Sequence, residues 1–137
     1  MPYEELSHTA DLRIKVFGES LEHLFSESVG ALYNIIFRRV VTCKGIEKDT
    51  FSITACNTDI LFHDFLDEVL YLTMVKKRKI CQFHLKIDEL NKTVTVNYSY
   101  EKVKKGEIKK EVKAITYHKL HIQKNGDFYE TEVIMDV

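Results

Sequence analysis

The first regular pattern in the chain is a short alternation of apolar and polar residues. Leu12, Ile14 and Val16 are interleaved with charged residues, which predicts a half-buried strand that ends at Gly18. Ser20 is a suitable N-cap for a following helix. Apolar residues then recur at helical spacing to about residue 37: Leu21, Leu24, Phe25, Val29, Leu32, Ile35 and Ile36. We therefore predict a strand followed by an amphipathic helix.

A second helix is predicted after a short strand at residues 51–55. It opens at Thr58 and runs to about Lys76. Apolar residues occupy most of its surface and leave little polar face beyond His63, Asp64, Asp67 and Glu68. A surface helix would show only an apolar stripe, so we expect sheet both above and below this one.

The rest of the chain is patterned as strands and turns. Apolar residues alternate at 83–87 and 94–100, and residues 89–92 suit a hairpin connection. After a turn at Gly106, two more strands are predicted over Val112–Ile122 and Phe128–Val137. The predicted order is strand, helix, strand, helix and four strands, which indicates an α+β fold with mostly antiparallel pairing. With one Pro and five Gly in the sequence, residues 1–137 read as a single domain.

The charge balance narrows the functional classes. The 137 residues carry 21 acidic and 20 basic side chains, a net charge of -1, which argues against a general nucleic-acid binder. The balance is uneven, with -6 over residues 1–75 and +5 over residues 76–137. No membrane-length apolar run or signal-peptide pattern is visible, so we expect a cytoplasmic protein without membrane contact.

Several common chemical motifs are missing. The sequence has three cysteines, Cys43, Cys56 and Cys81, and no two of them form a Cys-x-x-Cys motif. We expect all three to be reduced thiols that pack as small apolar side chains. No Gly-rich phosphate loop, nucleophile elbow or His-Glu-x-x-His pair is present. The dipeptide His63-Asp64 is similar to one found in metal phosphohydrolases, but it lacks further partners and is interpreted as a helix-surface pair.

Two aspartates near opposite ends of the chain are candidate metal ligands. Strand parity places Asp11 and Asp136 on polar faces, and the α-carboxylate of Val137 follows Asp136 directly. If the terminal strands are neighbours, these oxygen groups would form a pocket for Ca²⁺, Mn²⁺ or Mg²⁺. Charged residues near chain ends are also common without an ion, and spacing alone leaves both interpretations open.

A third cluster lies on the penultimate predicted strand. Lys113 and His118 bracket it, and on the pattern alone they are interpreted as an edge-strand lysine and a hydrogen-bonded histidine.

Taken together, these clusters make the chain similar to archease, a small protein family associated with tRNA processing. The similarity covers essentially the whole chain and rests on segments in a fixed order: HTAD at 8–11 with GESLEHLF at 18–25, LFHDFLDEVLY at 61–71, VKAITYH at 112–118 and VIMDV at 133–137. Phe65, Asp67 and Val137 stand where the family usually has Trp, Asn and Ile.

The resemblance implies an accessory factor for the GTP-dependent RNA ligase that joins tRNA exon halves. Such a factor promotes guanylylation of the ligase and its multiple turnover, contacts RNA only through the ligase and is itself no enzyme. Carried over by motif, Asp11, Asp136 and Val137 would bind a divalent metal ion, with Ca²⁺ expected ahead of Mn²⁺ or Mg²⁺. His8 would orient a carboxylate, and Lys113 and His118 are candidate partner-facing residues.

Three other functions stay open. The resemblance also allows a chaperone or specificity modulator of tRNA-modifying enzymes such as a tRNA methyltransferase. A metal-dependent hydrolase built on Asp11, Asp136 and His8 would lack an evident nucleophile or general base. An RNA-binding module would rest on residues 76–79 and 102–113, whose lysines we interpret as solvated turns and strand edges. The oligomeric state is not predicted.

Overall fold

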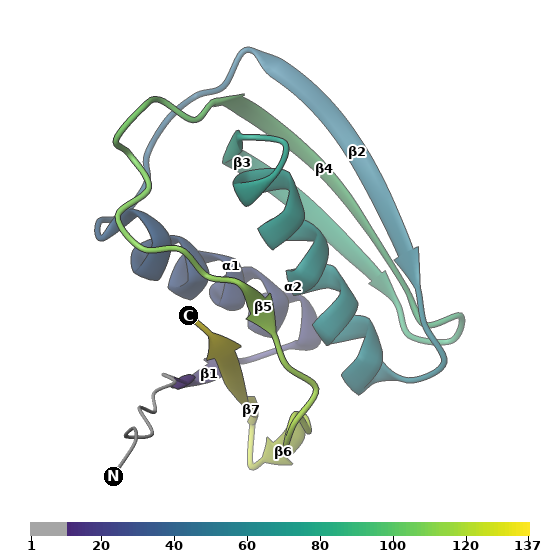
Figure 1. Ribbon diagram of the computed structural model, residues 1–137. Helices are drawn as coiled ribbons and strands as arrows, with labels where there is room; N and C mark the ends of the chain where they lie inside the picture. Colours follow the sequence, from purple (N-terminus) through teal and green to yellow (C-terminus); the bar gives the residue numbers. More distant parts are fainter. Residues whose placement is uncertain (1–10) are drawn as a thin grey trace, which may run out of the picture.

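The computed structural model describes residues 11–137, and its elements alternate as predicted in the first half of the chain (Figure 1). Their bounds are β1 (Asp11–Gly18), α1 (Leu21–Phe37), β2 (Glu47–Thr54), α2 (Thr58–Met74), β3 (Arg78–Asp88), β4 (Thr93–Lys102), β5 (Ala114–Ile115), β6 (Gln123–Asn125) and β7 (Phe128–Asp136). The α+β class is confirmed. Five strands rather than four follow α2.

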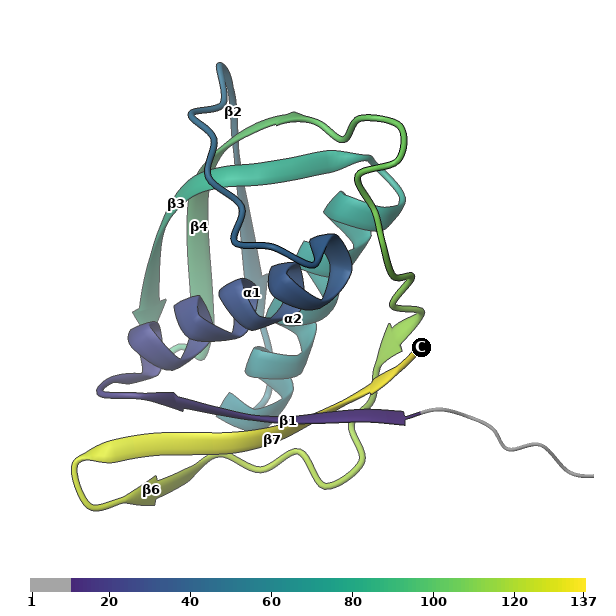
Figure 2. The same cartoon turned by 90° about the vertical axis from the view of Figure 1, so that its left-hand side faces the viewer.

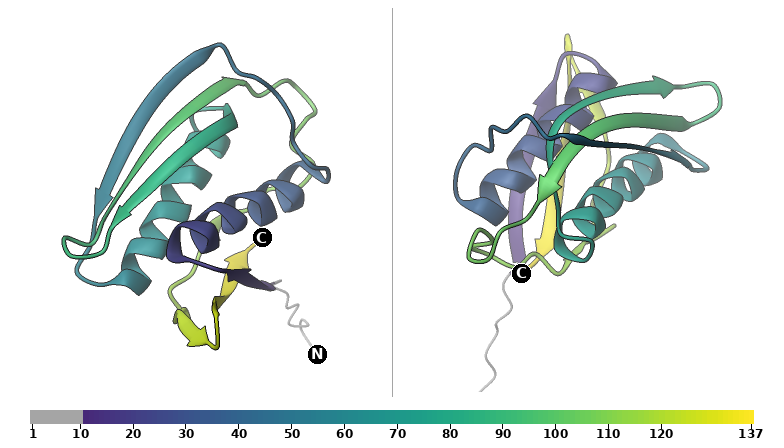
Figure 3. Two further views of the ribbon diagram at one scale, coloured as in Figure 1. Left: turned by 180° about the vertical axis from the view of Figure 1, so that it is seen from behind. Right: turned by 90° about the horizontal axis from the view of Figure 1, so that it is seen from above.

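The strands form two antiparallel sheets that enclose the helices. One sheet has the order β1-β7-β5, with β6 also paired to β7, and the other has the order β2-β4-β3. Figure 2 shows β1 and β7 side by side below the helices, and Figure 3 shows the three-stranded sheet arching over them. Helix α2 contacts β2, β3 and β4 on one side and β5 on the other, so the expected sheet above and below it is confirmed.

The core lies between the two helices and the inner faces of both sheets. Phe25 of α1 packs edge-on against Phe62 of α2, with ring centroids 5.1 Å apart, and against Phe65 at the same distance. Phe51 of β2 reaches Phe65 from the three-stranded sheet. Val133 and Met135 close the core from β7 and are fully buried. The nearly all-round apolar surface of α2 is explained by this double cover.

The helix starts are fixed by side-chain caps. Ser20 accepts a hydrogen bond from the His23 N–H at 3.0 Å, and Asn57 accepts one from the Ile60 N–H at 2.8 Å. Gly18 allows the turn between β1 and α1 to pass close to Leu24, because a Cβ at residue 18 would lie 2.3 Å from the Leu24 nitrogen. Over residues 11–137, neither helix combines the length and apolarity needed to span a membrane.

The prediction of one long strand over Val112–Ile122 is wrong. Only Ala114 and Ile115 form β5, and the Thr116 N–H extends the pairing by one bond to Ile134 O. The chain then turns, with a positive φ of 57° at Lys119, and returns to β7 as β6. Eight residue steps separate Ile115 from Gln123, but only five separate their partners Met135 and Glu130 in β7, so the extra residues leave the strand pairing as a turn.

Candidate metal centre

The structure brings Asp11 and Asp136 together. Strands β1 and β7 are antiparallel neighbours, and their register places Asp11 directly opposite Asp136. The predicted pocket required β1 and β7 to be neighbours, and they are. Val137 follows Asp136 and packs its side chain against the core. His8, the predicted orienting residue, lies outside the residues that the structure describes.

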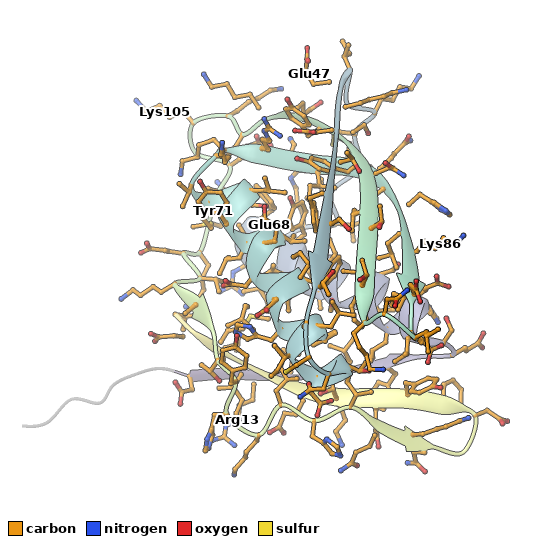
Figure 4. All side chains as sticks on the ribbon, turned by 90° about the vertical axis from the view of Figure 1, so that its right-hand side faces the viewer. Arg13, Glu47, Glu68, Tyr71, Lys86 and Lys105 are labelled. Atoms are coloured by element: carbon orange, nitrogen blue, oxygen red, sulfur yellow. A yellow bond between two sulfur atoms is a disulfide. The ribbon has the colours of Figure 1, made fainter. Side chains whose placement is uncertain are left out.

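Both aspartates point away from the helices. Their strand neighbours Leu12 and Met135 face the core as an opposed pair, so parity turns the two carboxylates to the outer face of the sheet. Arg13, two residues from Asp11 on the same face, also projects outward below the sheet (Figure 4). Asp11 is exposed on this face, whereas Asp136 is half-buried.

Like charges that face each other across two strands repel. Among residues 11–137, no lysine, arginine or histidine nitrogen forms an ion pair with Asp11 or Asp136. Two carboxylate groups of hard oxygen suit Ca²⁺, Mg²⁺ or Mn²⁺. Over residues 11–137, no third His, Cys, Asp or Glu side chain joins these two as a possible ligand.

Strand β5 borders the pair on the other side of β7. Ala114 is the register partner of Asp136, and the Lys113 N–H donates to the Asp136 main-chain oxygen at 2.7 Å. The side chains of Lys113 and His118 are both exposed.

The interpretation of His63-Asp64 as a helix-surface pair is wrong for the histidine. His63 is only 5% exposed, because the segment from β5 to Tyr117 covers this part of α2. The His63 Nε2 donates to Ile115 O at 2.7 Å, and Nδ1 lies 2.9 Å from Asp64 Oδ1. A carbonyl oxygen only accepts, so this bond fixes Nε2 as a donor.

Tyr117 completes this cluster from outside. Its ring stacks on the His63 ring with centroids 3.6 Å apart, and its hydroxyl donates to Asp64 Oδ1 at 2.8 Å. That hydrogen bond to the carboxylate, with partial burial, raises the pKa of Tyr117 above its usual value. The cluster fastens β5 to α2, and β5 in turn supports the end of β7 that carries Asp136.

These supporting residues were missed as a group. The signal was a His-Asp dipeptide on an otherwise apolar helix, combined with an aromatic residue in the 112–118 segment. A polar side chain on a helix face that must be buried needs a hydrogen-bond partner. The sequence does not say which strand supplies that partner.

The prediction of reduced, packed thiols is wrong for Cys43 and Cys81, and for Cys56 it is right about the free thiol but wrong about its packing. Cys43 and Cys81 form a disulfide, and Cys56 is free and exposed. Lys79 also departs from the expectation of a solvated strand edge, since it is 3% exposed and pairs with Glu101 and Glu107. Lys79, Glu101 and Glu107 thus form a second polar cluster, at the three-stranded sheet.

The fold and the acidic pair define a class: an α+β domain with two helices between antiparallel sheets and two facing aspartates on the adjacent strands β1 and β7. Two solved structures share the fold. A protein from Methanobacterium thermoautotrophicum, Protein 1598, superposes with a TM-score of 0.77 at 28% identity, covering 96% of each chain. An archease from Thermotoga maritima, described as a possible chaperone, gives a TM-score of 0.71 at 22% identity and covers 100% of this chain and 98% of its own.

Sequence comparisons give the particular family. The model of the Archease protein family (MTH1598/TM1083) matches residues 3–137. The archease of Pyrococcus furiosus is 33% identical over 129 residues, covering 91% of this chain and 90% of its own. That of Methanosarcina mazei is 27% identical over 143 residues, covering 98% and 95%. The chain belongs to the archease family, which confirms the resemblance identified from the sequence.

Proposed function

We propose that this protein is a metal-binding accessory factor that activates a GTP-dependent tRNA-splicing RNA ligase in the cytoplasm. The observation that carries the proposal is the placement of Asp11 opposite Asp136 on the outer face of the sheet. Membership of the archease family supports the choice of partner. The factor promotes guanylylation of the ligase and its repeated turnover, and RNA is contacted through the ligase.

In this proposal Asp11, Asp136 and the main-chain carboxylate of Val137 hold the divalent ion. Ca²⁺ is the first choice, and Mn²⁺ or Mg²⁺ are alternatives, because all three prefer oxygen ligands. When bound, the ion neutralises two facing carboxylates and supplies a positive centre for oxygen atoms of the ligase or its nucleotide. The chain's own residues position that centre, with β5 and the His63 cluster holding β7 in place. His8 would orient one carboxylate.

An activation assay with a matched control tests the proposal. Asp136→Ala should abolish stimulation of ligase guanylylation and of multiple-turnover sealing, while the fold, followed by circular dichroism, is retained. Glu132→Ala is the control, because Glu132 lies on the same strand and face and pairs in register with Lys15 instead of another acid. If Asp136→Ala stimulates the ligase as well as the control does, the proposal is wrong.

The role of Val137 is tested separately by calorimetry. Deleting Val137, or adding one residue after it, moves the terminal carboxylate and should weaken Ca²⁺ and Mn²⁺ binding. Undiminished affinity in both variants would exclude the Val137 carboxylate as a ligand, without affecting the assignment of Asp11 and Asp136.

A second candidate function is a chaperone or specificity modulator for a tRNA-modifying enzyme such as a tRNA methyltransferase. The description of the Thermotoga maritima structure as a possible chaperone favours it. Suppression of partner aggregation would then persist in chelator and in Asp136→Ala. Activation of the ligase would be lost under both conditions, so the two functions are distinguished in parallel assays.

A further inference from the structure

A second cluster of metal-ligating atoms lies on the far side of the molecule from the acidic pair, where the α1–β2 connection meets the three-stranded sheet. Cys43 lies in that connection, Cys81 in β3 and Glu101 in β4. The two sulfur atoms and a Glu101 carboxylate oxygen all lie within 4.8 Å of one another. All three residues are half-buried, and the cysteines are joined as a disulfide.

A β-bulge aims Cys81 toward Cys43. Ile80 pairs with Tyr100 and Gln82 pairs with Ser99, so Cys81 is the extra residue without a partner in β4. Bulges bend a strand and redirect a side chain, and they recur next to functional sites. Cys81 also lines a cavity of about 430 Å³ between α1 and β3.

Cys43 is held beside the bulge by contacts that do not depend on the disulfide. The Ser99 hydroxyl donates to Lys44 O at 2.8 Å. Gly45, with φ of 69°, lets the connection approach β4 so closely that a Cβ there would lie 2.7 Å from the Tyr100 nitrogen. These two contacts flank Cys43 on its C-terminal side. The two thiols therefore stay close when the disulfide is reduced.

Lys79 supplies a compensating charge. Its ammonium group is buried and lies 3.0 Å from Glu101 and 2.7 Å from Glu107, which also pairs with Arg39. Two thiolates, one carboxylate and a divalent cation carry a net charge of -1, which this ammonium neutralises. The same contact orients the Glu101 carboxylate.

We propose that Cys43, Cys81 and Glu101 form a redox-gated site for a thiophilic divalent ion, with zinc as the natural occupant. A dithiol reductant passes two electrons and two protons to the disulfide, becomes a disulfide itself and leaves two thiols. Each thiol then releases a proton to water as its sulfur binds the ion, and Glu101 adds an oxygen ligand. Two sulfurs on a tetrahedral zinc lie about 3.8 Å apart, given Zn–S bonds of about 2.3 Å, so the closed disulfide cannot hold the ion.

Cobalt provides a visible probe for this site. The wild-type protein is reduced with a phosphine, freed of reductant without air and titrated with Co²⁺. We expect one equivalent to bind with the thiolate-to-cobalt charge-transfer absorption and strong visible bands of tetrahedral cobalt, and Zn²⁺ to displace it. The oxidised protein should show neither absorption. Zn²⁺ should also raise the melting temperature of the reduced protein.

Matched variants separate this site from other cysteine and metal chemistry. Cys43→Ser should lose the charge-transfer absorption, whereas Cys56→Ser, at the exposed free cysteine, should keep it. Glu101→Gln should weaken cobalt binding by about tenfold or more. Asp136→Asn should bind cobalt through thiolates like the wild type, so failure of the ligase proposal and failure of this one are distinguishable.

Three results would overturn the inference. One is the absence of thiolate absorption in the reduced wild type, and another is its persistence in Cys43→Ser. The third is loss of the folded state on reduction, since the site requires that the α1–β2 connection stay in place. Any of these would leave the Cys43–Cys81 pair as a structural cross-link only.

Discussion

Replacing Asp136 by Asn should make the metal-free protein more stable. Asn keeps the shape of the side chain and removes its charge, so it relieves the repulsion from Asp11 across the sheet. Facing side chains in antiparallel strands lie about 5 Å apart, where two unit charges repel by about 0.8 kcal/mol in water and about 3 kcal/mol at an effective dielectric constant of 20. Asp11 is exposed, so screening favours a value near 1 kcal/mol.

Adding the ion should make the wild type more stable than Asp136→Asn, the reverse of their order without the ion. For a domain of this size, about 1 kcal/mol raises the melting temperature of Asp136→Asn above that of the wild type by about 4 °C in chelator. Ca²⁺ at a hundred times its dissociation constant stabilises the wild type by about 2.7 kcal/mol. Asp136→Asn has lost a charged ligand, so Ca²⁺ should stabilise it much less. Thermal unfolding followed by circular dichroism, in chelator and across a calcium titration, measures both effects.

Glu132→Gln is the control for this experiment. Glu132 faces Lys15 in the same pair of strands, so neutralising it removes an attraction instead of a repulsion and should lower the melting temperature slightly. The electrostatic argument is refuted if Asp136→Asn melts no higher than the wild type in chelator, or if calcium raises the melting temperature of both proteins equally.

Three further changes probe the scaffold. Tyr33→Phe should cost about 1–3 kcal/mol by leaving a buried main-chain N–H without its acceptor. Burial raises the pKa of Tyr33 to about 12, so the wild type should lose stability as pH rises from about 10 to 12, where the unfolded tyrosine ionises first. Urea unfolding at several pH values should show a smaller loss in the variant. Gly18→Ala should destabilise by about 1–3 kcal/mol because its Cβ would meet the Leu24 main chain, whereas Gly30→Ala, in open space on α1, should stabilise by about 1 kcal/mol. His63→Leu should cost about 2 kcal/mol and speed hydrogen exchange in β5, and unchanged exchange there would contradict the fastening role.

Elements with a clear period were predictable from the sequence. Both helices begin where predicted, after the Ser20 cap and at Thr58, and β3 and β4 contain the predicted alternations on either side of a hairpin. The opposition of Asp11 and Asp136 was predictable only as a condition, because parity gives the face of a strand and not its neighbour. The pairing of β1 with β7 met that condition.

The features that could not be predicted depend on tertiary contacts. A bulge at Cys81 leaves no period in the sequence, so the approach of Cys43 across the α1–β2 connection was hidden. Lys79 ends a basic run that begins with two exposed lysines, and only the fold places Glu107 beside it. The pKa of Glu107 reflects the same contact. Desolvation raises this pKa, but hydrogen bonds, chiefly the one from Lys79, outweigh the desolvation and hold the pKa below its usual value.

The pairing of β1 with β7 has a consequence for how the chain folds during synthesis. Residues 11–18 leave the ribosome early, but their strand partner, residues 129–136, is made more than a hundred residues later. Until then β1 presents an unpaired edge, of the kind that invites wrong pairing, and contacts this distant in sequence slow folding. The helices and the three-stranded sheet have all their residues in place by Lys102 and can assemble first. The acidic pair therefore arises only in the final closing step, and an ion that bound to it would select chains that have finished folding.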